Sequence, residues 1–375
     1  MGYRVLSDEA YKIVADEVVD AGSTTHVGEQ HIKTGKIHIE VDPSAYGLIR
    51  RSLPRLELVD GTFVLLVGIP MLVEKRADTT GSMGGNIDVL FDVLPKSFKV
   101  LNSVVLSRYD LQIMNGTFQD VADKVVMYRS QAEMAEKIAR QLTYMYPERA
   151  GNDFEEDPQY SLFGGAFLTD AFVNKYGLKY HDSSIGDAPG RDDLDPDVLE
   201  RIYGETVWEK VAENGFADID RNHIPSSQEI GIELQKRAHA FFYQIGDHPE
   251  TTRWWKSVLG KDRIVRMPYT QLQPYVEAAV IGLTEGVVDL QTIDDFLRES
   301  HQGIRRDDVN LIKKYVSHIP IGAQTALPNF NKIPLKGARF AKKGDLWPMD
   351  ENPENMSSKE DGKPGTKKKN KKMWL

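Results

Sequence analysis

The sequence predicts an α/β protein built on a doubly wound, mostly parallel β-sheet with helices on both faces. Apolar runs typical of buried strands alternate with segments of helical periodicity from residue 71 to residue 286. This alternation favours parallel strands joined by helical crossovers, which cover both faces of a sheet. The segment of alternating strands and helices has recognisable limits. A β-rich segment precedes it, and the periodic spacing of apolar residues is lost after about residue 325.

The composition excludes several classes of protein. The chain has 375 residues, of which 41% are hydrophobic, enough for a sizeable core. Its formal net charge of −9 argues against a protein that mainly binds nucleic acid. The absence of cysteine excludes disulfides, thiolate metal sites and cysteine nucleophiles. No apolar run approaches the roughly 18 residues of a membrane helix, and the charged N-terminus is not typical of a signal peptide, so we expect a cytoplasmic protein.

The sequence divides into four parts. They are an N-terminal extension (1–67), the alternating domain (68–290), a C-terminal helical extension (291–330) and a disordered lysine-rich tail (331–375). Within the first part, residues 8–20 have helical spacing and residues 35–70 are β-rich. The tail is rich in Pro, Ser, Asn, Lys and Gly, and it cannot bury enough apolar surface to offset its ordering entropy.

The elements of the alternating domain follow in order. Apolar runs predict strands at 71–78, 110–118, 178–190 with its turn, 239–247 and 263–268. Helical spacing predicts helices at 84–101, 130–146, 159–176, 197–215, 230–238 and 270–286. The capping-box patterns of Ser130 with Glu133 and of Ser226 with Glu229 mark two helix starts, and Asp157 before a proline marks a third.

The stretch RADTTGSMGG, residues 76–85, carries the main site candidate. Asp78, Thr80 and Ser82 are spaced two apart at the end of a predicted strand, so their side chains can point the same way. A carboxylate and two hydroxyls are hard oxygen ligands, which suit Mg²⁺. The alternative is an ordinary capped turn, in which Asp78 or Thr80 caps the next helix.

A cation at this position needs a second negative ligand. The stretch leads into a helix N-terminus, where the macrodipole favours anions over cations. Asp187 follows a later strand of the same series, and the carboxyl ends of such strands share the ligand-binding edge of the sheet. The acidic loop with Asp153, Glu155 and Glu156 can approach the same edge.

The string DTTGSMGG, residues 78–85, resembles the first motif of the metal-ion-dependent adhesion site (MIDAS) in von Willebrand factor A (vWA) domains, whose pattern is D-x-[ST]-x-S. The resemblance covers about residues 68 to 290 and implies a vWA, Rossmann-like fold. It also implies that Asp78, Thr80 and Ser82 are metal ligands and that Asp187 supplies the carboxylate from a later strand. The family's threonine in the middle loop is missing from GNDFEEDPQYS, where Asp153 is the nearest match. The implied ion is Mg²⁺, with Mn²⁺ or Ca²⁺ as alternatives.

Two strands depart from the family pattern. A strand covered on both faces should be nearly all apolar, but the strand at 71–78 contains Glu74, Lys75 and Arg76. We therefore expect this strand to be shorter than usual or partly exposed. The later strand, HDSSIGD, is also more polar than a buried strand should be.

The resemblance implies a protein-binding adaptor or scaffold. In such domains the protein supplies an incomplete metal shell, and an Asp or Glu of a protein partner completes it. Bacterial and phage chains of this kind resemble adaptors for AAA+ ATPases, so an AAA+ ATPase is one candidate partner. We expect no catalysis, because no nucleophile–base–orienter arrangement is visible. We expect no membrane partner, and nucleic acid only through the lysine-rich tail.

Two alternatives for the function remain open. Asp78, Asp187 and Asp153 can instead hold Mg²⁺ that activates a water, as in a hydrolase. The site can also be degenerate, leaving a vWA scaffold without metal. Separately, Trp254 and Trp255 form either a stacking platform or, as we favour, packing contacts in the core and at a helix edge.

Overall fold

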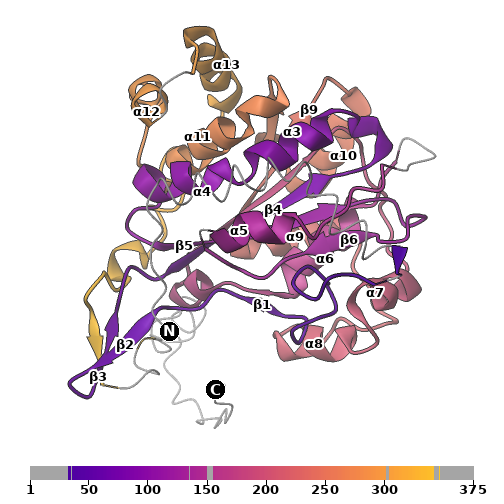
Figure 1. Ribbon diagram of the computed structural model, residues 1–375, viewed down its shortest axis with the longest axis horizontal. Helices are drawn as coiled ribbons and strands as arrows, with labels where there is room; N and C mark the ends of the chain where they lie inside the picture. The colour runs from indigo at the N-terminus through magenta and orange to yellow at the C-terminus, as the bar shows by residue number, and fades with distance from the viewer. Residues whose placement is uncertain are drawn as a thin grey trace, which may run out of the picture.

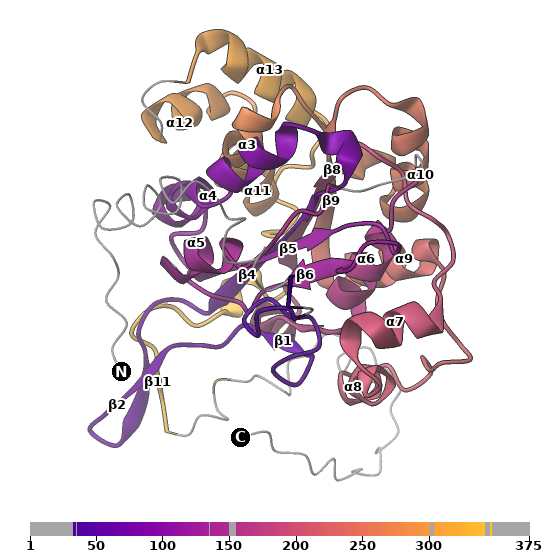
Figure 2. The same cartoon turned by 45° about the vertical axis from the view of Figure 1, so that its right-hand side comes forward.

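A six-stranded β-sheet forms the centre of the protein (Figures 1 and 2). The structure, a computed structural model, describes residues 33–34, 36–134, 136–149, 155–300, 304–341 and 346. The strands are β1 (Arg50–Arg51), β2 (Leu56–Val59), β3 (Thr62–Leu65), β4 (Pro70–Asp78), β5 (Asp110–Phe118), β6 (Met127–Arg129), β7 (Thr169–Asp170), β8 (Tyr180–Gly186), β9 (Ala238–Ile245), β10 (Ile264–Met267) and β11 (Arg339–Phe340). The helix predicted at 8–20 lies outside the described residues.

The central sheet is mixed. Its strand order is β10-β9-β8-β4-β5-β6. The pairs from β10 through to β5 are parallel, and β6 runs antiparallel to β5 at the edge. The α/β class predicted from the sequence is therefore confirmed as a mixed sheet with helices packed against it. Strand β6 was not predicted, because it is only three residues long.

Helices lie along both sides of this sheet. They are α3 (Asn86–Val93), α4 (Lys96–Val100), α5 (Glu136–Leu142), α6 (Pro158–Phe167), α7 (Pro196–Tyr203), α8 (Val207–Glu213), α9 (Ser227–Arg237), α10 (Pro249–Leu259), α11 (Gln273–Glu285), α12 (Ile293–Ser300) and α13 (Arg306–Val316). Short 3-10 turns include η1 (Gly81–Met83), η3 (Phe172–Tyr176) and η6 (Phe330–Lys332). Figures 1 and 2 show α3, α4 and α11 on one side of the sheet and α6 and α9 on the other.

Strand β4 contradicts the expectation that its charges would shorten or expose it. All nine of its residues are buried, and it pairs with β5 on one side and β8 on the other. Glu74, Lys75 and Arg76 are each 1–2% exposed. Because successive side chains of a strand point to opposite faces, Glu74 and Arg76 face one helical layer and Lys75 faces the other.

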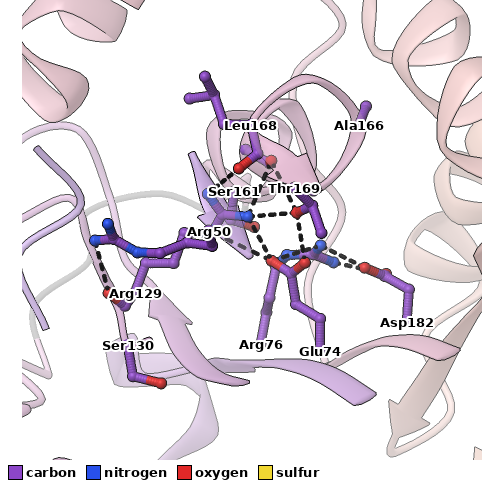
Figure 3. A network of polar contacts seen from close by, with 12 residues as sticks. Arg50, Glu74, Arg76, Arg129, Ser130, Ser161, Ala166, Leu168, Thr169 and Asp182 are labelled. Atoms are coloured by element: carbon purple, nitrogen blue, oxygen red, sulfur yellow. Dashed lines mark hydrogen bonds and ion pairs between the residues drawn. The ribbon is translucent and has the colours of Figure 1, made fainter. Parts of the chain in front are cut away.

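Glu74 and Arg76 belong to a buried charge network on the α6 side of the sheet (Figure 3). The Arg76 guanidinium donates to both carboxylate oxygens of Asp182 on β8 and lies 3.1 Å from Glu74 Oε1. Arg129 Nη2, from the edge strand β6, lies 3.2 Å from the same Glu74 oxygen. The Thr169 hydroxyl donates to Glu74 Oε2 at 2.9 Å. The two carboxylates thus meet two guanidiniums, which makes their burial tolerable.

The pKa values of the network follow from this pairing. Burial alone would raise the pKa of Glu74, but the charges of Arg76 and Arg129 outweigh it and lower that pKa. Burial raises the pKa of Asp182 to about 6, although Arg76 opposes the change. Helix α6 packs very closely against this network: a Cβ at Gly165 would lie 2.0 Å from Arg76 Nη2. Only glycine leaves room for the guanidinium there.

Lys75 is neutralised separately on the opposite face. Its ammonium lies 2.6 Å from Glu277 Oε2 of α11, and both side chains are 1% exposed. Burial lowers the pKa of Lys75, and the charge of Glu277 opposes that change. Helix α11 is therefore tied to β4 by an ion pair, whereas on the opposite face Arg129, the partner of Glu74, donates to the carbonyl of Gly164 on α6.

The segment after β6 also differs from its prediction. Ser130 and Glu133 do not form a capping box: the backbone of Ser130 donates to Asn115, and Glu133 exchanges two backbone hydrogen bonds with Ile113. Pairing with β5 therefore overrides the local helix signal, and α5 begins only at residue 136. The second capping box, Ser226 with Glu229, is confirmed at the start of α9.

The segments that flank the alternating domain pack onto it. Strand β1 pairs in parallel with β7, and Arg50 at its start is buried, with its guanidinium donating to backbone carbonyls of Asp42 and Ala45. Strands β2, β3 and β11 form a separate antiparallel sheet. The predicted disordered tail starts at 331, but β11 lies within it and is held by backbone pairing with β3, which needs no apolar period. The lysine-rich end of the tail lies outside the described residues.

None of the helices in the described part of the chain has the length and apolar composition that a bilayer crossing requires.

Replacing Lys75 tests whether β4 depends on its buried ion pairs. We expect Lys75→Met to lower the free energy of unfolding by about 3–5 kcal/mol, because Glu277 is left as an uncompensated buried charge. The double variant Lys75→Met/Glu277→Leu should recover most of this loss. Arg266→Met, which breaks a surface pair with Asp247, should cost less than about 1 kcal/mol. Urea unfolding measures all three, and equal stabilities of Lys75→Met and Arg266→Met would contradict the expectation.

Candidate metal centre

The candidate site lies where β4 and β8 end side by side. Asp78 is the last residue of β4, and Asp187 directly follows β8. These neighbouring parallel strands lie at the point of the sheet where the strand order changes direction. Open α/β sheets bind ligands beyond the carboxyl ends of strands at such a point. The prediction that both carboxylates reach one edge of the sheet is therefore met by the geometry.

A chain of hydrogen bonds joins the four residues singled out from the sequence. Asp78 Oδ1 accepts from the backbone N–H of Thr80 at 3.0 Å and from its hydroxyl at 2.6 Å. The hydroxyls of Thr80 and Ser82 are 3.1 Å apart. Ser82 Oγ donates to Asp187 Oδ1 at 2.8 Å. The two carboxylates are thus linked through two hydroxyls, all of them oxygen donors that suit a hard cation.

One oxygen of Asp78 remains without a partner inside the protein. Asp78 is fully buried, and its Oδ2 has no hydrogen bond. Gly186 leaves the room for this carboxylate: a Cβ there would lie 2.9 Å from both Asp78 Cβ and Asp78 Oδ2. A buried carboxylate oxygen that receives no hydrogen bond is costly, and a cation would satisfy it.

Glu156 joins the site from the loop before α6. Its backbone N–H donates to the carbonyl of Pro189 at 2.9 Å, which fixes this loop beside the turn after β8. The side chain is 1% exposed, and its Oε2 has no hydrogen-bond partner. Asp153, the predicted ligand from this loop, lies outside the described residues. The sequence placed a ligand in this loop and named Asp153; Glu156 is the residue of the loop that the structure places beside the site.

The pKa values of the three carboxyl groups are raised, chiefly by burial. Burial, together with the charge of Asp187, raises the pKa of Asp78 to about 7. Burial and the charge of Asp78 raise the pKa of Glu156 to about 9, although the Thr80 hydroxyl lowers it. Burial also raises the pKa of Asp187. Nearby, Arg191 pairs with Asp157 at 2.7 Å.

The residues present fit a divalent cation only as a mixed set of oxygens. Among the described residues, no three Asp, Glu, His or Cys side chains gather closely enough to hold a metal by themselves. The hydroxyls of Thr80 and Ser82 would therefore have to complete the set, together with waters. This composition matches the preference of Mg²⁺, which binds few carboxylates and keeps several waters.

The capped-turn alternative is met only in part. Asp78 accepts from the N–H two residues on, as in an Asx turn. However, η1 and α3 have no side-chain cap: their N-cap residues, Thr80 and Gly85, make no capping hydrogen bond. The hydroxyl of Thr80 instead points to Asp78 and Ser82.

Comparisons with known proteins add little about this chain. No family model matches it, and no curated protein matches it in sequence. Among solved structures it is similar to the open conformation of the pilus adhesin SpaC from Lactobacillus rhamnosus GG, with 11% identity and a TM-score of 0.39, covering 66% of this chain and 34% of that one. It is also similar to a von Willebrand factor type A structure from Catenulispora acidiphila, with 10% identity and a TM-score of 0.32, covering 59% of this chain and 44% of that one. A third is proximal thread matrix protein 1 of the mussel byssus, with 10% identity, a TM-score of 0.34, and coverage of 58% and 48%.

The chain thus spans less than half the length of each of these three structures. All three TM-scores are below 0.5, and the fold of this chain is defined by its own strand order and connections.

Gly186→Ala tests the close approach that shapes the site. The new methyl group collides with the Asp78 carboxylate, so we expect a loss of about 1–3 kcal/mol in the free energy of unfolding. Gly85→Ala is the matched control, because a Cβ there meets nothing within 4 Å and its φ of −68° suits alanine. Denaturant unfolding of the two variants should separate them clearly. Equal stabilities would mean that Asp78 is not held against Gly186.

Proposed function

We propose that this protein has a vWA-like, doubly wound fold and binds another protein through a divalent cation, with Mg²⁺ as the first candidate. Asp78, Thr80, Ser82 and Asp187 would hold the ion, and Glu156 would add negative charge beside it. Once bound, it would neutralise the buried carboxylates and offer exchangeable positions to a ligand from outside. An Asp or Glu of the partner is the group with the matching chemistry.

The observation that carries the proposal is the pair of unsatisfied carboxylate oxygens. Asp78 Oδ2 and Glu156 Oε2 are both buried without a hydrogen-bond partner, and burial together with the charge of Asp78 raises the pKa of Glu156. Carboxylates that only stabilise a fold are normally paired or hydrogen-bonded. The earlier residues of β4 follow that rule, since each charged side chain of β4 before Asp78 has an ionic partner.

The surroundings favour binding over hydrolysis. Ser82 and the glycines at 81, 84 and 85 are exposed, so the hydroxyl end of the site opens onto the surface. A cavity of about 420 Å³ lies between the starts of α11 and α13, and its lining includes Tyr269, Tyr275 and Arg305 but none of the proposed ligands. An exposed rim suits docking by a protein surface better than enclosure of a small substrate.

The kind of partner follows from the site's chemistry. A carboxylate supplied in trans would replace water on the ion, so recognition should require both the metal and one acidic side chain of the partner. An AAA+ ATPase is one candidate for that partner. The lysine-rich tail offers a separate electrostatic contact to acidic molecules, including nucleic acid.

Cation binding should stabilise the folded protein. At a Mg²⁺ or Mn²⁺ concentration about 100 times the dissociation constant, we expect a gain of about 2.7 kcal/mol in the free energy of unfolding. Asp78→Ala should abolish the gain, whereas Asp247→Ala, which removes an exposed carboxylate after β9, should retain it. Thermal unfolding with and without EDTA measures the effect, and calorimetric titration measures the affinity.

Partner capture then tests the bridge itself. A protein recovered with the wild type in Mg²⁺ should be lost in EDTA and with Asp78→Ala, but kept with Asp247→Ala. Retention of every partner under all conditions would refute the bridge, and a wild type that binds no divalent cation would leave the fold as a metal-free scaffold.

A further inference from the structure

Helix α10 holds the turn that follows β8, and this turn carries the proposed metal ligand Asp187 and supports Glu156 beside it. The turn comprises residues 187–192. It receives hydrogen bonds from three side chains of α10: the Thr251 hydroxyl donates to the carbonyl of Asp187 at 2.8 Å, and Trp255 Nε1 donates to the carbonyl of Ala188 at 3.1 Å. Trp254 Nε1 donates to the Asp192 carboxylate at 3.1 Å.

The α10 side chains that make these contacts are closely packed. Thr251 and Trp255 are fully buried, and they lie four residues apart, on one face of the helix. The Trp255 ring stacks on Phe242 of β9, with ring centres 4.0 Å apart and an interplanar angle of 8°. Trp254 meets Trp255 edge to face. The two tryptophans are therefore packing residues, and their indole N–H groups serve the turn.

The turn contacts both sides of the site. Asp187, at its start, accepts from Ser82 through its side chain and from Thr251 through its carbonyl. Pro189, in its middle, accepts the backbone N–H of Glu156 at 2.9 Å. The Trp254 ring covers Gly190, where a Cβ would lie 2.6 Å from the ring. A shift of the turn would therefore move Asp187 and Glu156 together, relative to Asp78 on β4.

We propose that Thr251 and Trp255 are positioning residues that set the cation affinity of the site by fixing the turn at 187–192. This inference rests on the proposed function, because it concerns the same ion. Neither side chain touches the proposed ligand oxygens, so each acts through backbone carbonyls next to them. Removing such supporting hydrogen bonds typically weakens metal binding by 10–100-fold in metalloproteins.

The test uses the full chain and Mn²⁺ as the probe, with free Mn²⁺ measured by electron paramagnetic resonance. Thr251→Val keeps the shape but loses the donor, and Trp255→Phe keeps the ring stacking but loses the indole N–H. Each should weaken Mn²⁺ binding by about tenfold or more. Thr251→Ser keeps the hydroxyl and should restore affinity to within about twofold of the wild type.

Two matched controls separate positioning from general damage to a helix. Thr252→Val removes the neighbouring hydroxyl, which bonds Gln244 and the carbonyl of His248 rather than the turn. Trp208→Phe removes an indole N–H that bonds Glu200 on α7. Both should bind Mn²⁺ as the wild type does. If Thr251→Val does not fold, Trp255→Phe against Trp208→Phe decides.

A second readout needs no metal. In EDTA, amide hydrogen exchange at Glu156 and across 187–192 should be faster in Thr251→Val and Trp255→Phe, and unchanged in the two controls. If the wild type binds Mn²⁺ and both variants bind it equally well, the inference is overturned and the proposed function stands. If the wild type itself binds no Mn²⁺, the proposed function fails, and this inference fails with it.

Discussion

The structure depends on the neutralisation of three consecutive charges inside the central strand β4. Glu74 and Arg76 are paired with Arg129 and Asp182 on one face, and Lys75 is paired with Glu277 on the other. Burying a charge in a protein interior costs several kcal/mol unless it is paired and hydrogen-bonded. The pairing partners come from β6, β8 and α11, so the neutralisation of β4 also ties the sheet edge, the neighbouring strand and one helical layer to the centre. An apolar strand could pack there without these partners, whereas this one requires them in place.

At its end, the same strand carries a buried carboxylate, Asp78, that has no ionic partner within the residues that the structure describes. Four residues after Glu74, Asp78 has one oxygen bonded to Thr80 and the other without a partner, and its charge faces those of Asp187 and Glu156. Within β4, the charges of Glu74, Lys75 and Arg76 are paired, whereas among the described residues the Asp78 carboxylate at the end of the strand has no ionic partner. This contrast within one strand supports a cation site more strongly than the residue types alone, because the same strand carries an ammonium group at Lys75 and a guanidinium group at Arg76.

The sequence predicted the parts that local pattern controls. The strand at 110–118 appears with those bounds, and the capping box at Ser226 starts α9 as expected. Asp78, Thr80, Ser82 and Asp187 were expected at one edge and are joined there by hydrogen bonds, although their role as ligands stays a prediction. The rest depends on contacts between distant residues. The partner of Lys75 lies 202 positions away, so the burial of β4 could not be read from its own charges. Ser130 carried a helix-start signal that pairing with β5 overrode. Glu156 is held beside the site by a hydrogen bond from its backbone N–H to the carbonyl of Pro189, a contact between residues that are distant in the sequence.

The central claim is that these oxygens hold a divalent cation, and anomalous diffraction from crystals grown with Mn²⁺ tests it most directly. The account predicts an anomalous peak bounded by the side-chain oxygens of Asp78, Ser82 and Asp187, absent from crystals of Asp78→Ala grown in the same way. Mn²⁺ bound only elsewhere on the protein, with the hydrogen bond between Ser82 and Asp187 unchanged, would contradict it.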